Sequence, residues 1–263
     1  MATAVFFHAH PDDETIITGG TMAKMASEGH RVVLVTATGG ELGEVPEGFL
    51  GPGDDIASRR AEELAAACRV LGVSRHVTLG FHDSGMAGAP SNEADGSFWQ
   101  TDVDHAAADL ASVLEEEGAE VLTIYDENGG YGHPDHVQVH RVGMRAAERC
   151  GTPRLYLATV NRTHLQRLAA EAPAFGVDLP DDVAADLSTL GVEEDEITTA
   201  VDVQAFLGAK RRAMEAHASQ IAETSFFLAV PPEVFAAVWG TEWYIRHGAK
   251  TGGPVETSLL PTP

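Results

Sequence analysis

Two segments of the sequence combine histidine, proline and aspartate in the same order. FFHAHPDDE covers residues 6–14, and HPDH covers residues 133–136. Neutral imidazole and carboxylate groups are ligands that suit zinc, and a catalytic zinc site keeps a fourth position open to water beside three protein ligands. We predict that these three ligands are His10, Asp13 and His136.

Asp12 and Asp13 are adjacent in the sequence, so their side chains point in different directions. If Asp13 binds the metal, Asp12 can face the bound water and accept a proton from it as a general base. Zinc lowers the pKa of bound water to about 7, so hydroxide is available at neutral pH. The chemistry predicted for this pair of acids is metal-assisted hydrolysis.

Other interpretations of the two segments stay open at this stage. The acids at 12–14 are suited to cap a helix, because anions at a helix N-terminus are stabilised by about 0.3–1 kcal/mol. Capping and metal binding are compatible. His140 lies one helical turn after His136 and is an alternative ligand, as in the HExxH motif. We favour His136, because it fits better on the inward face that Val139 and Val142 define.

The elements that must position these residues alternate between strand and helix. Strand-like apolar runs occur at residues 4–7, 31–36, 76–79, 121–125 and 155–160. Helices are expected at residues 14–28, 57–71, 102–117 and 134–151, and each of them ends at a glycine. Apolar strands separated by helices indicate a parallel sheet covered on both faces. We therefore predict an α/β fold with a doubly wound, mostly parallel, Rossmann-like sheet.

Polar residues follow the first four predicted strands. The segments are HAHPDDE, TGGELGE, HDSGM and DENGGYGHPDH. Ligands of open α/β sheets bind beyond the carboxyl ends of the strands, so we expect both His-Pro-Asp segments to meet at this edge. A nucleotide-binding site is disfavoured, because no GxGxxG follows the first strand and acids lie where phosphates would bind.

The later part of the chain has a looser pattern. Residues 161–200 form an acidic stretch that contains proline, which we interpret as a lid or a small excursion that shapes the substrate pocket. A helix is expected at 202–223 and a short strand at 241–246. We treat residues 1–263 as a single domain.

Composition limits the partners and the compartment. The 17 basic and 40 acidic residues give a formal net charge of -23, which argues against nucleic acid and anionic membranes as partners. The N-terminal residues predict neither a signal peptide nor a membrane span. The two cysteines, Cys68 and Cys150, suit a reducing compartment, so we predict a cytoplasmic protein. A homo-oligomer is compatible with the sequence.

The motifs together resemble the LmbE-like, PIG-L superfamily of metal-dependent N-acetylglucosaminyl deacetylases. HAHPDDE and GGYGHPDH match its pattern without a gap. VVLVTATGGELGEV, RRAEELAAACRVLGV, DSGMAG and AHASQ look like the actinobacterial branch that works on mycothiol precursors and conjugates. The resemblance implies a zinc-dependent deacetylase that hydrolyses the N-acetyl amide of an acetylated aminosugar, such as N-acetylglucosaminyl-inositol in mycothiol biosynthesis.

The resemblance also implies roles for the residues of the two motifs. His10, Asp13 and His136 would bind one zinc ion per chain, with ferrous iron as an alternative metal. Asp12 would be the general base. These roles agree with those that the spacing predicts.

Further roles come from the resemblance alone. His133 and Tyr131 would stabilise or protonate the tetrahedral intermediate, and Asp135 would tune a neighbouring histidine. Arg60 and Asp83 would hold hydroxyl groups of the sugar or inositol. The alternatives are a solvated helix face for Arg60 and a turn residue for Asp83.

Three other interpretations are left open. His217, in AHASQ, is expected to be a helix-surface histidine rather than a functional residue. The substrate is alternatively a mycothiol S-conjugate or an aminosugar antibiotic precursor, cleaved at an identical site. A noncatalytic sugar- or metal-binding module would keep the fold but would not require Asp12 and His133.

Overall fold

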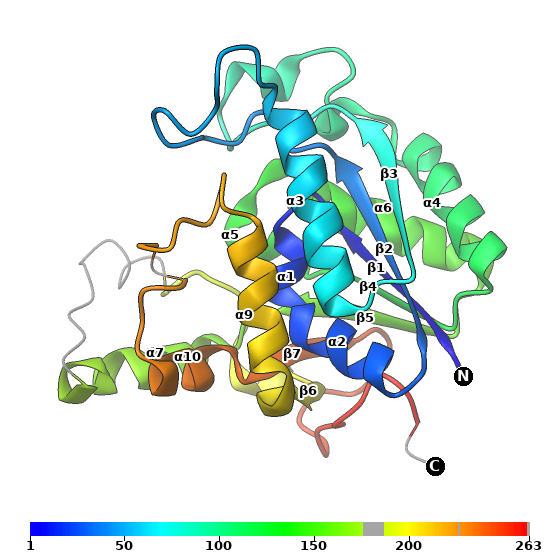
Figure 1. Cartoon of the computed structure of the whole chain (residues 1–263). Helices are drawn as coiled ribbons and strands as arrows, with labels where there is room; N and C mark the ends of the chain where they lie inside the picture. The colour runs from blue at the N-terminus through cyan, green and yellow to red at the C-terminus, as the bar shows by residue number, and fades with distance from the viewer. Residues whose placement is uncertain (176–186, 226, 262–263) are drawn as a thin grey trace.

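A mixed β-sheet lies at the centre of the computed structural model, which describes residues 1–175, 187–225 and 227–261 (Figure 1). Its seven described strands are β1 (Thr3–His8), β2 (Arg31–Thr38), β3 (Arg75–Phe81), β4 (Val121–Tyr125), β5 (Arg154–Thr159), β6 (Thr199–Asp202) and β7 (Thr241–Arg246). Their order across the sheet is β3-β2-β1-β4-β5-β7-β6. Strands β1 to β5 pair in parallel, whereas β7 is antiparallel to both β5 and β6.

Helices cover both faces of this sheet (Figure 1). One face carries α1 (Asp13–Ile17), α2 (Gly19–Ser27), α3 (Ile56–Leu71) and α9 (Leu207–Ala216), and the other carries α4 (Val103–Glu117) and α6 (Pro134–Cys150). The other α-helices of the described residues are α5 (Gly129–Gly132), α7 (Arg162–Glu171) and α10 (Pro232–Trp239). Short 3-10 turns span Pro90–Glu93, Phe98–Gln100, Ala172–Phe175, Glu194–Glu196 and Gln204–Phe206. No helix within the described ranges is long and apolar enough to cross a bilayer.

Side chains that alternate along β1 connect the two halves of the core. Phe6 packs in the cluster that contains Leu64 of α3, whereas Phe7 packs with Leu110 of α4 and Val142 of α6. Successive residues of a strand point to opposite faces, so a strand buried on both sides must be apolar throughout. The predicted doubly wound, mostly parallel sheet with helices on both faces is confirmed.

The helix predicted over residues 14–28 is wrong in one respect, because it is interrupted at Thr18, between α1 and α2. The cause lies far away in the sequence. Glu242 of β7 accepts hydrogen bonds from the backbone N–H groups of Gly20 and Thr21, both at 2.7 Å. A carboxylate is favourable at a helix N-terminus, so Glu242 stabilises a new start for α2. Lys210 neutralises this buried carboxylate at 2.6 Å.

The helix predicted over residues 202–223 is also wrong in its extent. The chain forms β6 up to Asp202, and α9 ends at Ala216. Beyond that residue the side chains of His217 and Ser219 form hydrogen bonds with Glu14 and Glu63, which lie outside α9. Tertiary hydrogen bonds therefore determine where this helix ends.

The stretch predicted as a lid, 161–200, contains regular structure in its described part. It includes α7 and the first two residues of β6, and β6 and α10 were not predicted at all. Residues 176–186 of the stretch lie outside the described residues. The lid stays a prediction.

At the edge of the sheet where β2 and β3 begin, Glu117 joins three elements. It pairs with Arg31 at 2.6 Å and with Arg75 at 2.7 Å. Hydrogen bonds from Arg31 and Arg75 lower the pKa of Glu117 from its ordinary 4.5 to about 2. The stabilisation that these ion pairs give to the folded state is complete above pH 4.5 and is lost as the pH falls toward 2.

Glu117→Gln is expected to lower the free energy of unfolding at pH 7 by about 1–2 kcal/mol, measured by urea denaturation.

Glu116→Gln provides the matched control for this prediction. Glu116 also lies 2.9 Å from Arg75, but its side chain is 61% exposed. We expect a loss below about 0.5 kcal/mol for this exposed pair. The difference between Glu117→Gln and the wild type should shrink as the pH is lowered from 7 to 3. Equal losses for the two variants, or a difference independent of pH, would contradict the prediction.

Candidate metal centre

The structure brings the two His-Pro-Asp segments together at the carboxyl ends of β1 and β4, which are neighbours in the sheet. The ring centroids of His10 and His136 are 5.5 Å apart, and those of His10 and His133 are 4.7 Å apart. All three imidazoles are buried and offer nitrogen atoms that lie within 4.8 Å of one another. The parallel register of β1 and β4 is what places residues 10 and 136 side by side.

Asp13 completes the predicted ligand set. Its Oδ2 atom lies 3.3 Å from Nδ1 of His10, and its Oδ1 atom lies 3.3 Å from Nε2 of His136. Ligand atoms of a tetrahedral zinc ion with bonds near 2.0–2.1 Å are about 3.4 Å apart. Both contacts have about this length, but they use different oxygens of Asp13, and the two sets of described residues whose ligand atoms all lie within 4.8 Å of one another are His10 with His133 and His136, and His10 with Asp83 and Asp135.

His136 has the hydrogen bonding of a metal ligand. Its Nδ1 lies 3.1 Å from the carbonyl oxygen of Gly129, to which it donates, so Nε2 keeps its lone pair. Nε2 is buried and has no hydrogen-bond partner among the described residues. Buried polar atoms are normally satisfied, and a metal ion would satisfy this one. The ring of Tyr125 stacks on the imidazole at a centroid distance of 4.3 Å and fixes its plane.

His10 is oriented by carboxylates on its other side. Its Nε2 lies 3.2 Å from Oδ2 of Asp135 and 3.6 Å from Oδ1 of Asp83, which leaves Nδ1 facing Asp13. A histidine that donates one N–H to a carboxylate and binds metal through the other nitrogen is a recurrent arrangement. Burial opposes the charged imidazole, but hydrogen bonds to Asp13, Asp135 and Asp83 raise the pKa of His10 well above its ordinary value. The three carboxylates around His10 thus favour a positive charge at this position.

Asp12 lies beside this cluster in an unusual backbone conformation. Its φ angle is 103°, and among the described residues it is the one non-glycine residue with positive φ. Such conformations cost about 1–3 kcal/mol and are concentrated at functional sites. Burial and the nearby Asp13 raise the pKa of Asp12 to about 6, although Arg60 opposes this shift. The carboxylate has the properties of a general base near neutral pH.

His133 is set up to donate a hydrogen bond into the site. It is the N-cap of α6, and its Nδ1 accepts the backbone N–H of Asp135 at 3.1 Å. The neutral imidazole therefore carries its proton on Nε2. Burial, together with the charges of His10 and His136, lowers the pKa of His133 to about 4, so the ring is neutral at pH 7. Tyr131 lies edge-on to it at a centroid distance of 6.2 Å and is 57% exposed.

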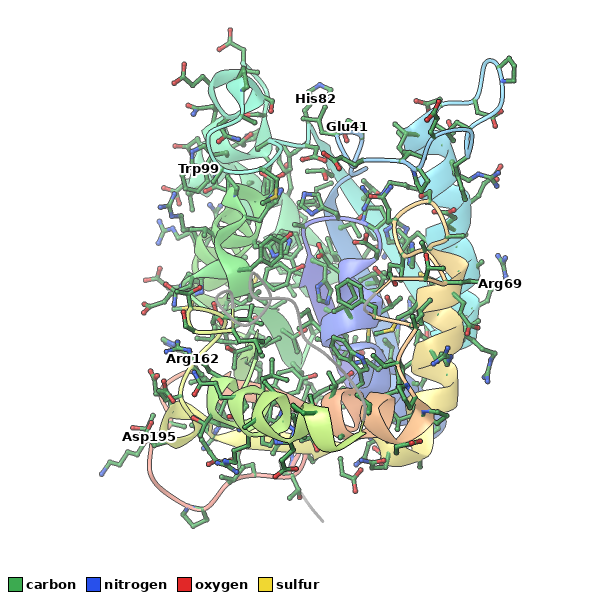
Figure 2. The ribbon with its side chains drawn as sticks, turned by 90° about the vertical axis from the view of Figure 1, so that its left-hand side faces the viewer. Glu41, Arg69, His82, Trp99, Arg162 and Asp195 are labelled. Atoms are coloured by element: carbon green, nitrogen blue, oxygen red, sulfur yellow. The ribbon has the colours of Figure 1, made fainter. Side chains whose placement is uncertain are left out.

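The loops after β2 and β3 form the rim above the cluster. Figure 2 shows Glu41 and His82, from these two loops, side by side at one end of the molecule, with Trp99 nearby. The Oε1 atom of Glu41 accepts the backbone N–H of Asp83 at 2.9 Å. Asp83 in turn accepts the N–H groups of Leu42 and Gly85 at 3.1 and 2.8 Å. Asp83 is therefore a turn residue as well as a neighbour of His10.

Arg60 is not on a solvated helix face, so that interpretation is wrong. It is 3% exposed, and its guanidinium donates to the carbonyl oxygen of Gly40 at 2.6 Å and to that of Pro11. It also lies 3.3 Å from Oδ2 of Asp12. The structure places Arg60 behind the predicted base.

Two other histidines are placed clearly. Nδ1 of His140 lies 3.0 Å from the carbonyl oxygen of Tyr125, and His140 belongs to neither candidate metal cluster of the described residues. His217 was expected on a helix surface, and this expectation is wrong. It is fully buried, and its Nε2 lies 2.7 Å from Oε1 of Glu14.

Asp126 is a further residue that the sequence did not single out. Its Oδ1 atom accepts the N–H groups of Asn128 and Gly130 at 3.0 Å each, and its Oδ2 atom accepts the hydroxyl of Thr159 at 2.5 Å. These bonds shape the turn whose carbonyl at Gly129 orients His136. The turn packs so closely that a Cβ atom at position 129 would lie 2.7 Å from the Cβ of that histidine. The signal was the DENGG segment that precedes the second motif.

The fold and this site together define a hydrolase of the metal-dependent type. The family model of PIG-L, described as GlcNAc-PI de-N-acetylase, matches residues 5–147. The chain belongs to this family, and it is accordingly an amidohydrolase.

Individual relatives extend the similarity over most of the chain. A protein of Acidothermus cellulolyticus named 1D-myo-inositol 2-acetamido-2-deoxy-alpha-D-glucopyranoside deacetylase is 44% identical over 264 residues, which cover 93% of this chain and 88% of the relative. A deacetylase of the teicoplanin biosynthesis pathway has a similar structure, with a TM-score of 0.60, 21% identity, and coverage of 95% of this chain and 100% of that one. For N,N'-diacetylchitobiose deacetylase of Pyrococcus horikoshii these values are 0.57, 20%, 93% and 83%. At these identities the two structures support the fold alone.

Proposed function

We propose that this protein is a zinc-dependent deacetylase that hydrolyses the N-acetyl amide of N-acetylglucosaminyl-inositol. The observation that carries the proposal is the buried set of His10, Asp13 and His136 beside Asp12, in which Asp13 lies 3.3 Å from each of the two imidazoles. The substrate follows the printed name of the relative from Acidothermus cellulolyticus, whose similarity extends over 93% of this chain. A bound zinc ion would supply an acidified water and a Lewis acid for the acetyl carbonyl.

Asp12 would accept the proton that the attacking water loses. The Arg60 guanidinium, at 3.3 Å, holds this carboxylate in place. We infer this role for Arg60 in addition to the hydroxyl binding that the family resemblance implies. General bases of this kind contribute about 10²–10⁴-fold to the rate.

His133 would stabilise the oxyanion that forms at the acetyl carbon. Its neutral ring presents Nε2–H, because Nδ1 is occupied by the backbone N–H of Asp135. Donors placed where negative charge develops contribute more than donors in water, because they need no reorganisation. The Tyr131 hydroxyl is a second donor, and either His133 or Asp12 would return a proton to the departing amine. Asp83 lies at the rim and is the candidate for binding a substrate hydroxyl.

The proposal extends to the organisation of the chain. We propose that residues 1–263 act as a single domain, since β6 and β7 from the second half complete the sheet that β1 to β5 begin. Both Cys68 and Cys150 are free, which supports a location in the cytoplasm.

A comparison of three substrates tests the proposed function. The zinc-loaded protein would be assayed for amine release from N-acetylglucosaminyl-inositol, from N-acetylglucosamine and from a mycothiol S-conjugate. We expect kcat/KM to be highest for the inositol glycoside, by about 100-fold or more over N-acetylglucosamine, because only this substrate would offer inositol hydroxyl groups to the rim residue Asp83. A preference for the S-conjugate would identify a conjugate amidase instead. Bound metal without cleavage of any substrate would indicate a noncatalytic module.

A further inference from the structure

The AHASQ segment, residues 216–220, has no part in the proposed reaction, yet its side chains bind three separate parts of the structure. Nε2 of His217 lies 2.7 Å from Oε1 of Glu14, at the start of α1. The hydroxyl of Ser219 donates to Glu63 of α3 at 2.6 Å. Gln220 donates to a backbone carbonyl in the loop after β2 at 3.2 Å. One of these partners, Glu14, lies two residues after the predicted base.

The contact between His217 and Glu14 needs an explanation beyond stability. Both side chains are fully buried. Burying two polar, ionisable groups costs free energy, and a buried pair of this kind is often replaced by apolar residues without loss of stability. A pair in such a position is therefore weak as a stabilising device. A role in arranging the site is the better explanation.

The second carboxylate oxygen of Glu14 contacts the predicted base, Asp12. Oε2 accepts the backbone N–H of Asp12 at 2.9 Å. The backbone carbonyl of Asp12 accepts the hydroxyl of Thr15 at 2.8 Å and its N–H at 2.9 Å. Asp12 is thus held from both sides in its conformation with φ of 103°. A disfavoured backbone conformation persists only when its surroundings determine it in this way.

We propose that His217 is a positioning residue for the general base. Its imidazole donates Nε2–H to Glu14, which fixes the carboxylate that holds the backbone of Asp12 and so directs the Asp12 side chain at the reacting atoms. The inference rests on the proposed function, in which Asp12 is the base. Small displacements of a catalytic group are costly, since about 1 Å of misplacement lowers the rate by about 10²-fold. His217 touches no reacting atom; it contacts Glu14, and a charge on its ring would also act on the pKa of Asp12, an effect that two neutral replacements of His217 remove equally.

Two substitutions of similar size separate positioning from simple loss of packing. In His217→Gln the side-chain amide nitrogen takes the place of Nε2 and can still donate to Glu14. In His217→Asn the amide nitrogen takes the place of Nδ1 and stops short of Glu14. Ser219→Ala is the matched control, because it removes a buried hydrogen bond of the same segment that leads to Glu63 and not to Asp12.

Kinetics of the zinc-loaded variants give the first test. We expect His217→Asn to lower kcat by about 30–100-fold with KM changed less than about 3-fold, whereas His217→Gln and Ser219→Ala stay within about 5-fold of wild-type kcat. Zinc affinity, measured by competition with a chelator, should change less than about 3-fold in all variants, because none of these residues is a ligand. Thermal unfolding would show that each variant is folded. Equal kcat values for His217→Asn and His217→Gln, or an equal fall in Ser219→Ala, would overturn the proposal.

A double substitution gives the second test. If His217 acts through the base, His217→Asn should lower kcat less than about 3-fold once Asp12→Asn is present, because there is no base left to position. The same 30–100-fold factor in both backgrounds would overturn the positioning role. Wild-type turnover in Asp12→Asn alone would exclude Asp12 as the base and so overturn that part of the proposed function. Impaired turnover in Asp12→Asn with normal turnover in His217→Asn would overturn the positioning role only.

Discussion

Replacement of Asp12 by asparagine is expected to lower kcat by about 10²–10⁴-fold while the protein keeps its full complement of metal. Asparagine has the size of aspartate and, like it, tolerates positive φ, so the backbone conformation at this position is preserved. It cannot accept a proton. The proposed ligands His10, Asp13 and His136 are unchanged in this variant. Steady-state kinetics on the inositol glycoside, together with metal analysis of the same sample, would measure both quantities.

Asp195→Asn is the control for this prediction, because Asp195 is exposed and lies in the 3-10 turn Glu194–Glu196 (Figure 2). We expect wild-type kinetics for it. Full turnover of Asp12→Asn at full metal occupancy would exclude Asp12 as the base. Loss of metal from Asp12→Asn would instead show that Asp12, and not its neighbour alone, is a ligand.

His136→Ala is expected to lose both metal and activity. The substitution removes Nε2, the buried nitrogen that faces Asp13 at 3.3 Å. Loss of a group that merely supports a ligand lowers metal affinity by about 10–100-fold, so loss of the ligand itself should lower it by more than about 100-fold. Competition with a chelator would measure the affinity. Activity should not return at zinc concentrations that saturate the wild type.

His140→Ala is the matched control, one helical turn further along α6. Its side chain bonds the backbone carbonyl of Tyr125 and not the cluster. We expect its metal affinity to stay within about 3-fold of the wild type, because no ligand and no group bonded to a ligand side chain is removed. If His140→Ala lost the metal while His136→Ala retained it, the ligand assignment would have to be exchanged between these two residues.

Much of the fold was predictable because its signals are local. Strands β1 to β5 are runs of apolar residues, and β7 has the bounds that its sequence predicted. Helices α3, α4 and α6 end at Gly72, Gly118 and Gly151, and each of these glycines adopts the left-handed conformation that glycine favours. Strand β6 was not predicted, because a four-residue strand depends on its pairing with β7. The break between α1 and α2 depends on Glu242, more than 200 residues further along the chain.

The candidate site was likewise predictable where its signal is local, and not where it depends on distant residues. Each His-Pro-Asp motif can be recognised from its own adjacent residues. The βαβ alternation was enough to predict that the two motifs approach each other at the carboxyl edge of the sheet. The contact between Glu14 and His217 spans 203 residues and has no local signal. Composition favoured a surface position for His217, since histidine is often exposed. Only the tertiary structure shows its burial.

The backbone at Asp12 also has a consequence for engineering. Glycine adopts a φ of 103° readily, so replacing Asp12 by glycine would relieve the strain of this backbone conformation and is an obvious choice in a search for thermostable variants. Such a variant would lose the proposed base and would leave the buried guanidinium of Arg60 without its carboxylate partner. Stability screens of this enzyme should therefore leave position 12 unchanged.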